Sequence, residues 1–182
     1  MKYGPVSFTD RLGREVILRN ADLSDGERLI EYLKATAAET PFLARDPDEI
    51  TLTAEQENEF ITEKTEDPKE LLLIAEIAGE HVGNCSVMRL GGGRRYAHRC
   101  DIGIALYRKY CGCGIGEKML RTVLDAAKEM GYGQAELEVV AGNTGAIALY
   151  EKLGFTKYGV FPDNMKYQDG TYADAVWMMK KL

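Results

Sequence analysis

The stretch from 110 to 116 reads YCGCGIG and runs directly into EKMLRTVLDAAKEM, which places three glycines in five positions just before a helical pattern. Apolar residues recur at helical spacing in that pattern, namely Ile115, Met119, Leu120, Val123, Leu124 and Ala127. The preceding stretch, YAHRCDIGIAL, has the composition of a strand. The sequence therefore predicts a strand, a tight turn and an amphipathic helix. Free backbone N–H groups at such a helix start form a nest for phosphate or diphosphate.

Two other glycine-rich loops fit these letters poorly. A P-loop needs Lys and Ser or Thr after its last glycine, whereas Glu117 follows Gly116. A dinucleotide-binding loop follows the first strand of a parallel unit, and this loop comes late in the chain. A tight turn that binds no ligand stays open on the glycine spacing alone.

Cys111 and Cys113 have the spacing that can begin a metal site. No second close ligand pair follows, and His81 and His98 are distant in sequence, so we expect no metal. Thiols at a helix N-terminus can acquire a lowered pKa and oxidise easily, although inert small side chains explain this pair as well.

The rest of the chain changes its hydrophobic period several times. Residues 14–20 read as a first strand, and residues 23–39 as a helix that begins with a capping box of Ser24 and Glu27. The apolar stripe of that helix is expected at Leu29, Ile30, Leu33 and Ala37. A second capping box, Thr53 with Gln56, opens a polar helix that continues to about residue 64.

From residue 71 onward, the pattern predicts three strands joined by short turns, followed by alternating helices and strands. Strands are expected at 71–78, 81–90, 96–106, 134–140, 155–161 and 171–182, and a short helix at 143–154. A turn-rich loop with Pro162, Asp163, Asn164, Asp169 and Gly170 separates the last two strands. This order predicts an α+β (mixed α/β) fold in a single domain, 1–182, with a mostly antiparallel sheet of about seven strands and about four helices.

Residues 98–182 resemble the acyl-CoA-binding half of the GNAT superfamily of N-acetyltransferases, and residues 14–97 resemble it in element order. The family's Q/R-x-x-G-x-G/A loop is matched by Cys111, Gly112, Cys113, Gly114, Ile115 and Gly116, with Cys111 in place of Gln or Arg. The family's N-x-x-A-x-x-L-Y-x-x-x-G-F run is matched by Asn143, Ala146, Leu149, Tyr150, Gly154 and Phe155. The resemblance implies a GNAT-like fold with residues 98–160 as the acyl-CoA-binding half and residues 24–65 as acceptor-side helices.

The resemblance also implies the reaction, in which an acetyl group passes from the cosubstrate acetyl-CoA to a primary amine of a small molecule or peptide. The amine attacks the thioester directly in a ternary complex. Tyr150 corresponds to the general acid for the leaving thiolate, and Asn143 to a residue that hydrogen-bonds the pantetheine or nearby backbone. Acyl-CoA contacts are implied at Ile104 and Leu106, with an oxyanion donor at a backbone N–H near Leu106. The loop from Cys111 to Gly116 would hold the diphosphate.

Asp101 is the first candidate for the general base, because it lies on the same strand as Leu106 at a position where some members of the family carry a glutamate. Glu136 and Glu138 share one face of a neighbouring strand and are rivals. All three can equally be solvated or ion-paired carboxylates. Two other functions stay open: a binding or regulatory module that holds acyl-CoA without turnover, and a nucleotide-binding domain.

Net charge and the composition of particular segments limit the classes of partner. The 182 residues carry a formal net charge of −6, which argues against nucleic acid as a partner. No apolar stretch approaches the roughly 18 residues of a membrane span, and the polar start lacks the apolar core of a signal peptide, so no membrane and a cytoplasmic location are expected. Acidic residues that could attract a cationic acceptor are Glu31, Glu39, Glu49, Glu55, Glu57, Glu59, Asp163 and Asp169. A homodimer is left open.

Overall fold

The computed structural model describes residues 1–182 and contains one eight-stranded sheet in the order β1-β2-β3-β4-β5-β6-β8-β7. Neighbouring strands are antiparallel except β5 and β6, which are parallel. The strands are β1 Val6–Thr9, β2 Glu15–Asn20, β3 Leu71–Ile77, β4 Glu80–Arg89, β5 Arg99–Leu106, β6 Gln134–Val140, β7 Thr156–Lys166 and β8 Tyr172–Lys181. The helices are α1 Gly26–Glu39, α2 Ala54–Glu66, α3 Ile115–Glu129 and α4 Thr144–Lys152.

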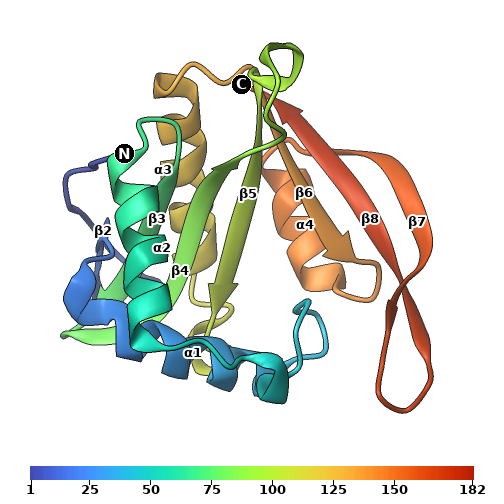
Figure 1. Cartoon of the computed structure of the whole chain (residues 1–182), viewed down its shortest axis with the longest axis horizontal. Coiled ribbons are helices and arrows are strands. Elements are labelled where there is room, and N and C mark those ends of the chain that lie inside the picture. Colours follow the sequence, from blue (N-terminus) through green and yellow to red (C-terminus); the bar gives the residue numbers. More distant parts are fainter.

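The helices cover the two faces of the sheet unequally (Figure 1). On one face, α3 and α4 pack over the sheet in a core of 29 buried residues that includes Cys100, Ile102 and Met119. On the other face, α1 and α2 form a smaller core with β3, centred on Leu29 and Ile74. The helices α1 and α2 lie over the β2–β5 half, and no helix covers this second face over β6, β8 and β7.

The feature that matters most for a binding site is the separation of β5 from β6. These parallel strands are paired at only three consecutive positions, the last being Asp101 with Glu136. Beyond that point, β5 stays paired with β4 as far as Leu106, and β6 stays paired with β8 as far as Val140. The two strands therefore diverge and leave a V-shaped opening in the middle of the sheet (Figure 1).

The expected element order and the mostly antiparallel sheet are confirmed, but the strand count is eight rather than about seven. The additional strand is β1, which pairs with β2 through Val6 and Leu18. It has only four residues and no buried side chain, so its hydrophobic pattern gave no signal.

The capping box of α2 is confirmed, with the Thr53 N–H donating to Gln56 at 3.0 Å and the Gln56 N–H donating to Thr53 at 3.3 Å. The capping box expected at Ser24 and Glu27 is wrong. Asp22 and Asp25 form it instead around a short 3-10 turn that precedes α1.

The stripe expected on α1 is partly wrong, because the buried positions are Gly26, Leu29, Tyr32 and Thr36. The turn-rich loop before the last strand is also shorter than expected. Strand β7 continues to Lys166 because an irregularity between Phe161 and Met165 absorbs the turn-forming residues in between. None of the helices is both long and apolar enough to span a bilayer.

Candidate functional site

Strand β5 presents unpaired backbone groups to the V-shaped opening. The Tyr107 N–H donates to the Val82 carbonyl on β4 at 3.1 Å. Because backbone groups of successive strand residues point to opposite edges, those of Ile104 and Leu106 point away from β4. Strand β6 has already separated at these positions. The opening is therefore lined by backbone donors and acceptors that are available to a ligand.

The glycine loop follows this strand after a short 3-10 turn, Arg108–Tyr110, and leads into a helix as predicted. Gly112 and Gly114 adopt the left-handed conformation, with φ of 77° and 84°, and α3 begins at Ile115. A Cβ on Gly116 would lie 3.2 Å from Leu106 Cδ1 and 3.7 Å from Ile104 Cδ1. A side chain at 116 would therefore crowd the end of β5 and require Leu106 to shift.

The first cysteine of the loop, Cys111, is not activated. Burial, together with the negative charge of Glu39, raises the pKa of the Cys111 thiol, so the lowered pKa considered for it is wrong. Its thiol donates to the Tyr107 carbonyl at 3.7 Å. The structure brings no three His, Cys, Asp or Glu side chains together in a metal-binding arrangement.

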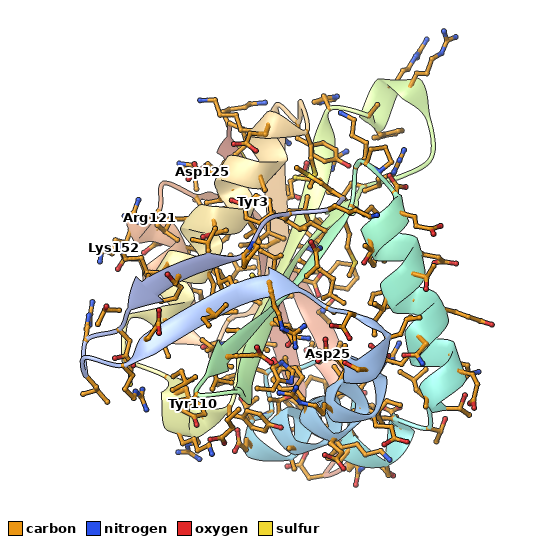
Figure 2. The ribbon with its side chains drawn as sticks, turned by 90° about the vertical axis from the view of Figure 1, so that its left-hand side faces the viewer. Tyr3, Asp25, Tyr110, Arg121, Asp125 and Lys152 are labelled. Atoms are coloured by element: carbon orange, nitrogen blue, oxygen red, sulfur yellow. The ribbon has the colours of Figure 1, made fainter.

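An acidic residue in the first turn of α3 is neutralised by two cations. The carboxylate of Glu117 accepts from Lys152 Nζ at 2.5 Å and from Arg121 Nη2 at 3.0 Å. These two cations lower the pKa of the Glu117 carboxyl. Figure 2 shows Arg121 and Lys152 on the same side of the molecule. The pair offsets the repulsion that Glu117 would otherwise exert on an anion at the helix start.

The predicted residues Asn143 and Tyr150 lie at the start of helix α4 and within it, and they have different roles in the structure. Asn143 is the N-cap, and its side-chain oxygen accepts from the Ala146 N–H at 3.3 Å. Tyr150 is 8% exposed, and its ring meets Phe155 edge-on at 5.8 Å between centroids. Burial and then the negative charge of Asp101 raise the pKa of the Tyr150 hydroxyl to about 12. The phenol therefore stays protonated at neutral pH.

Asp101 occupies the last paired position of β5, at the point where the V opens. It is half-buried and makes no hydrogen bond or ion pair with a protein side chain. Burial, followed by the negative charges of Glu136 and Glu138, raises the pKa of its carboxyl to about 6. A carboxylate with such a pKa is suited to exchange protons near neutral pH.

The two rival carboxylates on β6 are already engaged. Glu136 is 4% exposed and accepts from Arg99 Nη2 at 2.6 Å, which holds the pKa of its carboxyl below the ordinary value. Glu138 accepts from Trp177 Nε1 at 2.7 Å and from Asn164 Nδ2 at 2.9 Å. Of the three candidate bases, Asp101 alone has a carboxylate without a protein donor.

A wide cleft of about 970 Å³ lies between the segment following α1 and the tip of the β7–β8 hairpin. Two hydrogen bonds cross it: Tyr167 Oη donates to the Pro41 carbonyl at 3.0 Å, and Gln168 Nε2 donates to Asp46 Oδ2 at 3.0 Å. Of the acidic residues expected around an acceptor, those that line the cleft are Glu39, Glu49 and Asp169. The others, Glu31, Glu55, Glu57, Glu59 and Asp163, do not line it.

Comparison with known proteins gives one consistent family. Residues 29–155 match the family described as Acetyltransferase (GNAT) family. The N-alpha-acetyltransferase RimI of Mycobacterium tuberculosis is 33% identical over 106 residues, which cover 58% of this chain and 63% of that protein. A relative from Mycobacterium leprae is matched over 28% of its own length. The chain thus spans less than two thirds of each of these two curated relatives.

Solved structures agree in fold. An acetyltransferase of the GNAT family from Streptococcus pneumoniae superposes with a TM-score of 0.87 at 26% identity, covering 92% of this chain and 99% of that one. The yncA protein of Salmonella typhimurium, solved with its cofactor acetyl-CoA, superposes with a TM-score of 0.82 at 20% identity, covering 92% and 94% of the two chains.

Proposed function

Because the chain belongs to the acetyltransferase (GNAT) family, we propose that it transfers an acetyl group from acetyl-CoA to a primary amine. The observation that carries the proposal is the V-shaped opening in which the free backbone of β5, the glycine loop, Tyr150 and Asp101 come together. We place the acyl-CoA half in residues 98–160 and the acceptor side around residues 24–65, with the tip of the β7–β8 hairpin added to it.

The opening has the chemistry that acetyl-CoA requires. Pantetheine carries amides, which the unpaired backbone groups of Ile104 and Leu106 can hydrogen-bond as an added strand would. The diphosphate suits the backbone N–H groups at the start of α3, and Gly116 keeps that start free of side chains. Asn143 contributes by capping α4, which holds Tyr150 in place.

The chain's residues then divide the work of acyl transfer. Acetyl-CoA supplies the thioester that is attacked. Asp101 removes a proton from the attacking ammonium or amine, directly or through water, and the N–H of Leu106 donates to the oxygen that gains negative charge. Tyr150 donates its proton to the departing sulfur, and the C–N bond replaces the C–S bond.

The acceptor enters from the face that α1 and α2 leave open, where Asp101, Glu136 and Glu138 lie together. Glu136 is paired with Arg99, so the carboxylates of Asp101 and Glu138, which have no cation beside them, favour an acceptor that arrives as a cation. The relative from Mycobacterium tuberculosis is named an N-alpha-acetyltransferase. We therefore infer that peptide N-terminal amines are the first acceptors to test, followed by polyamines and amino sugars.

The test is an acetyl-transfer assay with acetyl-CoA, in which release of CoA is followed for each of these amine classes. Tyr150→Phe keeps the ring contact with Phe155 but removes the acidic proton. We expect kcat for the best acceptor to fall by about 100-fold. If the variant retains most of its kcat, Tyr150 is not the acid. If no amine is acetylated although acetyl-CoA binds, the non-catalytic acyl-CoA-binding module is the better description.

A further inference from the structure

The tip of the β1–β2 hairpin lies against the glycine loop, although the two are about a hundred residues apart in sequence. The Arg11 N–H donates to the Cys113 carbonyl at 2.9 Å. A Cβ on Gly114 would lie 3.2 Å from both Cγ and Nε of Arg11, and the three nearest heavy atoms to that position all belong to Arg11. The Arg11 side chain therefore lies across the N-cap of α3. Figure 2 shows the two strands crossing in front, with their turn on the side where Arg121 and Lys152 lie.

The turn that carries Arg11 is well supported. The buried carboxylate of Asp10 accepts from the N–H groups of Leu12 and Arg14, each at 2.9 Å, and from Arg14 Nε at 2.8 Å. The Arg14 guanidinium also lies over the ring of Tyr110, 5.2 Å from its centroid. Tyr110 belongs to the segment that leads into the loop. The hairpin tip and the loop are thus fixed to each other by a backbone hydrogen bond and a cation–π contact.

The charge of Arg11 is available to a ligand. Arg11 is exposed and forms no ion pair, because the carboxylate beside it in sequence, Asp10, is taken by Arg14. Of the other cations near the loop, Lys109 pairs with Glu80 at 2.6 Å and Lys152 pairs with Glu117, whereas Arg108 and Lys118 form no ion pair and do not approach Gly114 as Arg11 does. At the first position of the loop, Cys111 supplies no charge.

We propose that Arg11 binds the diphosphate of acetyl-CoA and supplies the cation that the loop lacks at Cys111. This inference rests on the proposed function. A guanidinium presents paired N–H donors that match two phosphate oxygens, and it would act together with the backbone N–H groups that begin α3. The N-terminal hairpin is then part of the cosubstrate site rather than only an edge of the sheet.

The test is calorimetric titration of acetyl-CoA and of 3′-dephospho-CoA into the full chain and its variants. For Arg11→Ala we expect Kd to rise about tenfold for both ligands, the size of one charge-assisted contact. Arg11→Lys should recover part of the affinity. Because dephospho-CoA lacks the 3′-phosphate but keeps the diphosphate, an effect seen only with acetyl-CoA would overturn the assignment to the diphosphate.

Two matched variants separate a lost contact from a disturbed hairpin or a changed net charge. Leu12→Ala alters the same turn at an exposed side chain, and Arg95→Ala removes an exposed arginine from the turn between β4 and β5. Both should bind like the unaltered protein. If the unaltered protein binds acetyl-CoA but Arg11→Ala matches Arg95→Ala, the inference about Arg11 is wrong and the proposed function stands. If the unaltered protein binds neither ligand, both are wrong.

Discussion

Asp101 illustrates how position sets the chemistry of a side chain. Glu136, opposite it on β6, is as acidic by residue type, but Arg99 keeps that carboxylate ionised and occupied. Asp101 lies one strand away without a cation, and the pKa of its carboxyl rises to about 6. Two neighbouring carboxylates thus have opposite shifts in pKa, the arrangement expected where one holds structure and the other exchanges protons.

This difference predicts the pH dependence of Asp101→Asn. A base acts only when it is deprotonated, so activity that depends on Asp101 is present above its pKa and is lost as the pH falls through it. In the plot of log kcat/KM against pH, the slope should therefore increase by one unit below about pH 6, where Asp101 becomes protonated. In the variant, this steepening should disappear and kcat/KM at pH 8 should fall by about 100-fold.

Glu138→Gln is the matched control for that measurement, because Glu138 is exposed and the amide oxygen of Gln can still accept from one of its two donors, Trp177 Nε1 or Asn164 Nδ2. It should keep the step but move it to lower pH, because the negative charge of Glu138 contributes to the raised pKa of Asp101. An unchanged step in Asp101→Asn, or its loss in Glu138→Gln, would place the base elsewhere on this face.

At residue scale, sequence reasoning recovered the candidates that a local motif carries. The loop from Cys111 to Gly116, Asn143 and Tyr150 were all identified as candidates from spacing or from family resemblance. The engagement of Glu136 by Arg99 and the approach of Arg11 to Gly114 were not, since each depends on pairing between segments that are distant in sequence. The choice among the three candidate bases therefore needed the structure.

At the scale of elements, strand β5 is paired along one edge with β4 and is unpaired along most of its other edge. The backbone groups of its odd-numbered residues face β4, and beyond Asp101 those of its even-numbered residues face the opening. This alternation follows from strand geometry, but the place where pairing with β6 stops is set by tertiary structure. The sequence predicted both strands and gave no sign that they separate.

Amide hydrogen exchange tests this account of β5 directly. In the free protein, the Leu106 N–H should exchange rapidly and the Ala105 N–H slowly, because only the latter faces β4. Saturating acetyl-CoA should slow exchange at Leu106 and leave Ala105 nearly unchanged. Equal protection of the two amides in the free protein would mean that Leu106 already has a partner, and the oxyanion donor would need reassignment.

Capping shows where element-scale prediction succeeds and fails. Thr53 and Gln56 form the expected box because the helix begins immediately after Thr53 and Gln56 occupies its third position. The Ser24 and Glu27 pair has the same spacing, but Asp22 and Asp25 also have it. The structure forms the capping box at Asp22 and Asp25, two residues earlier in the chain. Asp25 is also anchored by Arg19 Nη1 at 2.7 Å, a contact between β2 and this turn that no local pattern contains.

At the scale of the whole molecule, the sheet consists of two halves joined by three residue pairs. Strands β1 to β5 form one half, and β6, β8 and β7 form the other. Element order was sufficient to predict the mixed, mostly antiparallel sheet. The unequal coverage of the second face, which leaves the acceptor side open, depends on where α1 and α2 pack and could not be read from their sequences.

The central claim is that the opening between these halves holds acetyl-CoA, and one titration tests it. Calorimetry with the unaltered protein should show one acetyl-CoA per chain that CoA displaces and that ATP and NAD do not. Gly116→Val should abolish or greatly weaken this binding, because its side chain would collide with Leu106 and fill the helix start. Gly92→Val, at an open position, should bind normally. No acetyl-CoA binding to the unaltered protein, or equal binding to Gly116→Val when that variant is folded, would contradict the account.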